Sequence, residues 1–183
     1  MSDTLNPAER EILLAIARHA IETVVRTGRL NAEEREEPAL NRNRGCFVTI
    51  RRRGELRGCI GTFVSGQPLW REVAAMAASA ATRDPRFQPM KERELADFSV
   101  EISVLSPLEE TDDPNRIEVG KHGVYLENGF NRGVLLPQVA VEHGWDRLTF
   151  LQQTCLKAGL PADSWNSPQT RLYLFTAEIL TGQ

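Results

Sequence analysis

The stretch CFVTIRRRGELRGCIGTF, residues 46–63, predicts a β-hairpin that decides the fold. A strand rich in β-branched residues runs into the turn Arg53-Gly54, and a second strand returns beside it. A turn at these two residues pairs Val48 with Cys59. Cys46 and Cys59 then become diagonal neighbours, which lie close together but are poorly placed for a disulfide.

Helices flank this hairpin in the sequence. Asn6 can cap a helix in which apolar residues recur at helical spacing until Gly28 ends it. An alanine-rich helix is predicted over residues 69–82. Two prolines in residues 83–89 exclude a regular helix there, and residues 98–104 alternate as a strand with one buried face does.

The second half of the chain repeats part of this pattern. Residues 124–135 read strand, turn, Arg-Gly, strand, as residues 48–60 do, and a helix follows each. This echo indicates either two hairpin-plus-helix units that share one sheet or a chance likeness between two hairpins. Around it the sequence predicts an acidic loop at 109–116, short strands at 117–119, 124–127 and 133–136, a helix at 147–158 and a last strand at 171–180.

Helices and hairpin-linked strands together predict an α+β fold, with a mostly antiparallel sheet and flanking helices, rather than a doubly wound parallel sheet. The 183 residues are 41% hydrophobic and 26% charged, as in ordinary globular proteins. No apolar stretch is long enough for a signal segment or a membrane span, so no membrane association is expected. Three cysteines without paired spacing suit reduced thiols in a cytoplasm, and the sequence signals no metal site and no cofactor.

The charge is unevenly distributed along the chain. The net charge is −3, made of +4 over residues 1–93 and −7 over residues 94–183. Six arginines fall between Arg42 and Arg57, which suggests a basic stripe. Few aromatic residues interleave with it and the rest of the chain is acidic, which argues against nucleic-acid binding.

The densest signal for chemistry is Cys59, between Gly58 and Gly61. Glycines inside a strand indicate a bulge or the close approach of another backbone or a ligand. Strand alternation would place Arg57 on the same face as Cys59, where a guanidinium favours the nucleophilic thiolate. The alternative is that Cys59 is a small buried hydrophobic residue.

Two further candidates lie outside this hairpin. His122 could act as the base for Cys59 or be a hydrogen-bonded turn residue. Arg83 and Arg86, on either side of Asp84, could clamp an anion, or an Arg–Asp pair could pin this loop beneath the sheet.

The hexamer Leu56–Gly61, LRGCIG, resembles the hallmark of the AMMECR domain family, whose microbial members are called AmmeMemoRadiSam system protein A. The resemblance extends over about residues 10–178 and predicts one AMMECR-like domain over residues 1–183. Further matching motifs occur in the family's order, namely DPRF at 84–87, EISVL at 101–105, GKHG at 120–123, LLPQVA at 135–140 and CLKAGL at 155–160.

The resemblance implies a larger and a smaller lobe around a sheet, with the hexamer near the groove between them. It also implies an association with Memo-like proteins and radical-SAM proteins, hence a role in a modification pathway. The family's biochemical activity is itself unsettled.

Two functions from different classes follow. The first is a binding component that takes a small anionic ligand, or presents a substrate to a Memo-like or radical-SAM partner, through Arg57, Gly58, Gly61, Arg83 and Arg86. The second is an enzyme that uses Cys59 as a nucleophile with Arg57 and His122. An arginine-lined edge strand could also serve homodimerisation.

Overall fold

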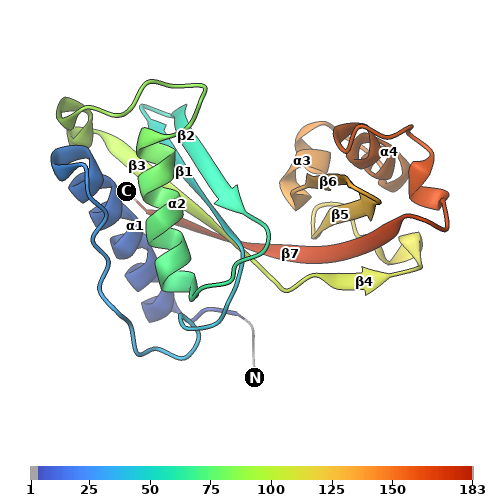
Figure 1. Cartoon of the computed structure of the whole chain (residues 1–183), viewed down its shortest axis with the longest axis horizontal. Helices are drawn as coiled ribbons and strands as arrows, with labels where there is room; N and C mark the ends of the chain where they lie inside the picture. The colour runs from blue at the N-terminus through green and yellow to red at the C-terminus, as the bar shows by residue number, and fades with distance from the viewer. Residues whose placement is uncertain (1–3, 183) are drawn as a thin grey trace. The chain divides into compact units, whose positions relative to one another are not determined.

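The computed structural model describes residues 4–182, which form two compact units (Figure 1). The first unit contains the chain up to Leu105 together with the segment that begins at Glu178, and the second is Ser106–Ala177. The larger and smaller lobes and the α+β class that the sequence predicts are thus confirmed. Within the described residues no helix is both long and apolar enough to cross a membrane.

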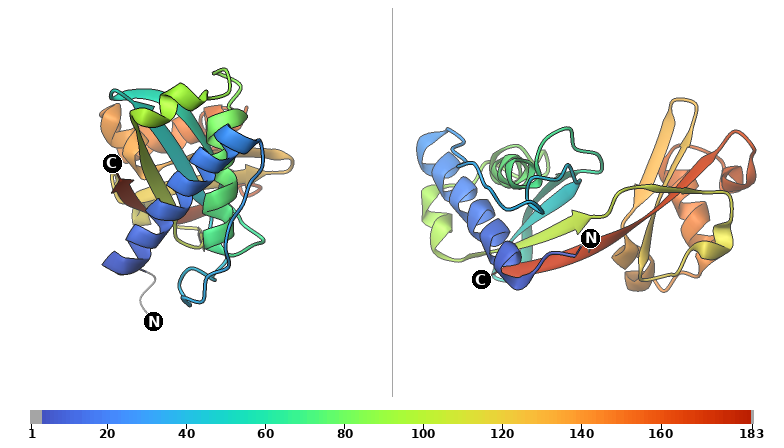
Figure 2. Two further views of the ribbon diagram at one scale, coloured as in Figure 1. Left: turned by 90° about the vertical axis from the view of Figure 1, so that its left-hand side faces the viewer. Right: turned by 90° about the horizontal axis from the view of Figure 1, so that it is seen from below.

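The first unit places two helices against one face of a sheet (Figure 2). Helix α1 (Pro7–Thr27) begins at a capping box of Asn6 and Glu9 and ends at Gly28, which has a φ of +70°. Helix α2 (Leu69–Thr82) has the bounds that the sequence predicts. Its alanines let it pack closely against α1 and the sheet.

The sheet of the first unit contains β1 (Cys46–Arg52), β2 (Glu55–Thr62) and β3 (Phe98–Leu105), all antiparallel. Three alternating residues of β1, Cys46, Val48 and Ile50, are buried in the core under the helices. The connecting turn has positive φ angles at Arg53 and Gly54, +53° and +82°, as a type I′ hairpin turn requires. A short 3₁₀ helix, η1 (Glu92–Ala96), precedes β3.

The predicted register of this hairpin is wrong by one residue. Arg51 pairs with Leu56, but Ile50 pairs with Gly58, so Arg57 is an extra residue in a β-bulge. Cys59 therefore pairs with Thr49 instead of Val48. A bulge interrupts the alternation of side chains along a strand, so the predicted placement of Arg57 and Cys59 on the same face does not follow here.

The two cysteines of this hairpin are consequently not diagonal neighbours. Cys46 is fully buried in the core under the helices, whereas Cys59 is half-buried and lies on the other face of the sheet. Both are free thiols.

The second unit repeats the plan of a hairpin followed by helices. Strands β5 (His122–Asn128) and β6 (Asn131–Leu135) form the hairpin, and α3 (Pro137–Glu142) and α4 (Arg147–Lys157) follow it. The core between sheet and helices is made of Val124, Leu126, Leu135, Phe150, Leu151 and Leu174 among others.

Three further elements of the second unit differ from the sequence expectation. The predicted acidic loop contains a strand, β4 (Glu109–Thr111), and a 3₁₀ turn, η2 (Pro114–Arg116), and the strand predicted at 117–119 does not form. A second 3₁₀ turn, η3 (Ser164–Asn166), precedes β7 (Arg171–Gly182).

Hydrogen-bonded strands follow the order β2-β1-β3-β7-β5-β6 across the sheet, and β4 pairs with β7.

Candidate functional site

Cys59 lies on the face of the first unit's sheet that α1 and α2 do not cover. The residues on either side of Thr49 in β1, Val48 and Ile50, point into the helix-covered core, so Thr49 and its partner Cys59 point the other way. The Thr49 hydroxyl donates a hydrogen bond to Cys59 Sγ over 3.2 Å. This thiol is half-buried, whereas Cys46 and Cys155 are buried and have pKa values raised by that burial.

Both glycines of the hexamer are explained by packing. A Cβ atom on Gly58 would lie 2.2 Å from the Ala80 carbonyl oxygen of α2, so only glycine lets the helix approach the strand here. A Cβ atom on Gly61 would lie 2.3 Å from the ring of Phe47, which packs over this position on the same face as Cys59. The sequence expectation of a close approach at these glycines therefore agrees with the structure.

A row of three polar side chains crosses the sheet at Cys59. Thr49 pairs with Cys59 on one side and with Glu101 of β3 on the other, and all three residues are half-buried. The row thus aligns a thiol, a hydroxyl and a carboxylate on one face. Sequence reasoning missed Thr49, because the correct partner of Cys59 depends on the bulge at Arg57.

Arg57 is held by an acidic residue of η1. Its Nε and Nη2 donate to the two carboxylate oxygens of Glu94 over 2.8 and 3.2 Å, and Nη2 also donates to the Gln88 carbonyl. The guanidinium of Arg57 holds the pKa of Glu94 below its ordinary value. With its side chain only 17% exposed, Arg57 is bound within the fold.

The side chains of Asp84 and Arg86 both hydrogen-bond to the backbone of Cys59 at the outer edge of β2. The Cys59 backbone N–H donates to Asp84 Oδ2 over 2.9 Å, and Arg86 Nη2 donates to the Cys59 carbonyl over 3.4 Å. Arg86 also grips Asp84 with Nε and Nη2, and this holds the pKa of Asp84 well below its usual range. The Arg–Asp pair that pins a loop is thus present, and it uses Nε and Nη2 of Arg86, while the side chain of Arg86 stays 54% exposed.

Two further residues that the sequence singles out, Arg83 and His122, make other contacts. Arg83 follows α2, and its backbone N–H donates to the Ser79 carbonyl. His122 opens β5 in the second unit, where its Nδ1 accepts a hydrogen bond from the Glu118 N–H over 3.1 Å. Since His122 and Cys59 belong to different units, no contact inside either unit joins them, and their pairing stays a prediction.

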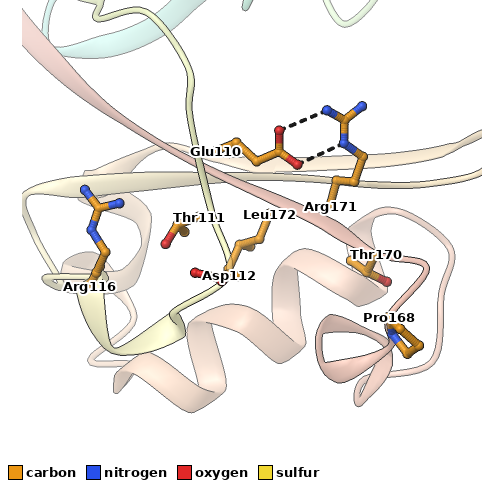
Figure 3. A pocket seen from close by; sticks show the side chains of 8 residues that line it. All are labelled: Glu110, Thr111, Asp112, Arg116, Pro168, Thr170, Arg171 and Leu172. Carbon is orange, nitrogen blue, oxygen red and sulfur yellow. Dashed lines mark hydrogen bonds and ion pairs between the residues drawn. The ribbon is translucent and has the colours of Figure 1, made fainter.

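The second unit contains a polar cavity that sequence reasoning missed. It has a volume of about 480 Å³, and Figure 3 shows the two arginines and two acidic side chains at its wall. Arg171 donates to both carboxylate oxygens of Glu110, over 3.0 and 2.9 Å, and Arg116 pairs with Glu109. The wall of the cavity is formed by Glu110, Thr111, Asp112, Arg116, Pro168, Thr170, Arg171 and Leu172.

This cavity depends on the pairing of β4 with β7, which brings together residues 61 positions apart, Glu110 and Arg171. The sequence of β4 has no apolar alternation that would have indicated a strand. The charges at the wall neutralise each other. No group of three or more His, Cys, Asp or Glu side chains suited to a metal ion occurs among residues 4–182.

Comparison with known proteins settles the family. The family model AMMECR1 matches residues 14–180. The chain belongs to the AMMECR1 family. A protein of Thermococcus gammatolerans is 46% identical over 180 residues, 92% of this chain and 88% of that protein. A protein of Methanothermobacter thermautotrophicus is 46% identical over 182 residues, 96% of this chain and 95% of its own.

A solved structure is also similar. The crystal structure of an uncharacterized protein from Pyrococcus horikoshii matches this AMMECR1 protein with a TM-score of 0.82 at 42% identity, covering 92% of this chain and 89% of the other. The names of these relatives state no activity. The residues of the AMMECR1 hexamer have different roles in this protein. Arg57, Gly58 and Gly61 serve the fold, whereas the Cys59 side chain lies on the open face.

Proposed function

We propose that this AMMECR1 protein is a binding component of a modification pathway, and that the sheet face around Cys59 contacts a Memo-like or radical-SAM partner. The observation that carries the proposal is the row of Cys59, Thr49 and Glu101 on the face away from α1 and α2. A half-buried polar row on a rigid sheet is suited to contact with another molecule. The resemblance to the AmmeMemoRadiSam proteins supports the choice of partners.

A protein partner is favoured over a small anionic ligand by the charges. Arg57 is neutralised by Glu94 and Arg86 by Asp84, so neither guanidinium contributes an unpaired positive charge. The open face itself carries the carboxylate of Glu101. An anion would therefore meet guanidinium groups whose charge is already balanced by a carboxylate, which weakens its attraction to this site.

The proposal is tested by calorimetric titration with the purified Memo-like and radical-SAM proteins of the same genome. Thr49→Arg places a bulky charge in the middle of the row, and we expect it to weaken binding at least tenfold. Glu101→Lys provides a second change on the same face, and Thr27→Arg adds an arginine to the exposed end of α1 as the control. Binding by neither protein, or equal affinity of the wild type and both face variants, contradicts the proposal.

A second function, an enzyme with Cys59 as nucleophile, is favoured by one contact. The Thr49 hydroxyl points its proton at the sulfur, and a donor in this place can hold a nucleophile in position. Alkylation by iodoacetamide at graded pH, followed by mass spectrometry of each cysteine, tests this function. Reaction of Cys59 near pH 7 well above the rate of an ordinary thiol supports it, and an ordinary rate or complete protection excludes it.

A further inference from the structure

The hairpin of β5 and β6 presents an aromatic side chain at its tip. Asn128 pairs with Asn131, so the loop between the strands consists of Gly129 and Phe130 alone. Phe130 is 104% exposed, the most exposed large hydrophobic residue in the described part of the chain. Figure 2, in its right-hand view, shows this hairpin projecting from the rest of the second unit.

The tip is held firmly by the strands below it. Gly129 has a φ of +60° while Phe130 has no positive φ, an arrangement typical of a tight type II′ hairpin turn. Asn128 Nδ2 donates to Thr170 Oγ1 over 2.9 Å, and the Thr170 hydroxyl donates to the Ser164 carbonyl over 2.6 Å. The backbone at Phe130 is therefore held in a defined place, and only the ring has to be ordered when a partner binds.

Nothing in the fold of the unit requires a phenylalanine at this position. A turn of this kind needs glycine at its left-handed residue, and its other residue is commonly Asn, Asp or Ser because these side chains hydrogen-bond to backbone or water. A fully exposed ring makes no contribution to the core and leaves its apolar surface in water. An exposed aromatic residue on a tight turn is the kind of side chain that dominates protein–protein contacts when a pocket receives it.

The charges around the tip indicate the chemistry of its partner. Arg132, two residues further on, is 69% exposed and lies 3.9 Å from Glu127, a long ion pair. One phenylalanine without a second anchor is too little for stable membrane attachment.

We propose that Phe130 is the anchor of a protein–protein contact, in which it enters an apolar pocket of a partner whose rim carries carboxylates facing Arg132. The contact is independent of the sheet face around Cys59. Transfer of a phenylalanine from water into such a pocket contributes enough free energy for at least a tenfold change in affinity.

The experiment places the photo-crosslinking amino acid p-benzoylphenylalanine at position 130 of the full chain, in its native host. The same probe at Val64, which is 70% exposed, provides the control. The protein crosslinked at position 130 is identified, purified and titrated with the wild-type chain and with Phe130→Ser, Arg132→Glu and Val64→Ser. The melting temperature of each variant is measured alongside.

The expected result is one protein crosslinked at position 130 and absent from the Val64 control. Its affinity falls at least tenfold with Phe130→Ser and falls with Arg132→Glu, while Val64→Ser binds as the wild type does and all melting temperatures agree. The proposal is overturned by adducts no more specific than those at Val64, by adducts to lipid alone or to a second copy of this chain alone, or by a purified protein that binds Phe130→Ser as it binds the wild type.

Discussion

The two hairpins of this protein share a packing plan and differ in what they present to the outside. In each, the second strand carries an Arg-Gly pair, and the glycine lies under the backbone of a following helix. A Cβ atom would lie 2.2 Å from the Ala80 carbonyl oxygen at Gly58 and 2.4 Å from the Thr154 carbonyl oxygen at Gly133. The shared glycine is thus a requirement of helix-on-strand packing.

The arginines that precede these glycines have different surroundings. Arg57 is 17% exposed and held by Glu94, whereas Arg132 is 69% exposed and only loosely paired with Glu127. The tips differ as well, because Arg53 at the first tip pairs with Asp97, while the second tip exposes Phe130. The same order of strand, turn, strand and helix therefore forms two different hairpins. The first is braced and positions Cys59, and the second projects and exposes an aromatic side chain.

The largest expected effect concerns the shared glycines. Gly58→Ala and Gly133→Ala should each lower the free energy of unfolding by about 3 kcal/mol, because the added methyl group overlaps a helix carbonyl. Urea unfolding measures the loss. Gly66→Ala is the matched control, since a Cβ atom there meets nothing within 4 Å. A Gly58→Ala protein as stable as this control would contradict the packing plan.

The arginines should separate the two hairpins. Arg57→Ala leaves the buried carboxylate of Glu94 without its main partner and should cost about 2 kcal/mol of unfolding free energy. Arg132→Ala removes an exposed side chain and should change stability by less than about 0.5 kcal/mol. Equal losses in the two variants, again by urea unfolding, would remove the distinction between a tightly held and a loosely paired arginine.

Acid should weaken the braced hairpin. The folded-state pKa values of Asp84 and Glu94 are lowered by Arg86 and Arg57, below unfolded values of about 3.9 and 4.3. The stability that these carboxylates contribute is therefore complete above about pH 5 and is lost as the pH falls further. Urea midpoints between pH 7 and pH 3 should fall less steeply for Asp84→Asn than for the wild type, and parallel curves would contradict the assignment.

The turn at the second tip should show a smaller effect than the glycines under the helices. Gly129→Ala places a side chain at a φ of +60° and should lower the free energy of unfolding by about 1 kcal/mol. Gly144→Ala, at a φ of +64° and also free of contacts, places an alanine at positive φ outside the hairpin and serves as the comparison. A Gly129→Ala chain that unfolds like the wild type would show that this turn is less rigid than described.

Local signals in the sequence predict much of the fold. The capping box of Asn6 and Glu9 predicts the start of α1, and the alanine-rich stretch predicts α2 with its observed bounds. The pair of Asp84 and Arg86 is one of the two alternatives that the sequence leaves open for this segment, because both partners lie two residues apart. These features depend on neighbours in the chain.

What the sequence does not predict depends on distant partners. The bulge at Arg57 depends on the approach of α2 to Gly58 and on Glu94, which is 37 residues away. The error of one residue in the register hid the pairing of Thr49 with Cys59. Likewise, the three residues of β4 become a strand only because β7 offers its edge, so the cavity beside Arg171 has no local signal.

The hexamer thus braces one hairpin and leaves the Cys59 face available to a partner. The most direct test is the rate at which iodoacetamide alkylates Cys59 in the native protein, alone and with a saturating Memo-like or radical-SAM partner. We expect Cys59 to be labelled while Cys46 and Cys155 are protected, and the bound partner to slow the labelling of Cys59 at least tenfold. A Cys59 as protected as Cys46 in the free protein, or a labelling rate that neither partner changes, would contradict this expectation.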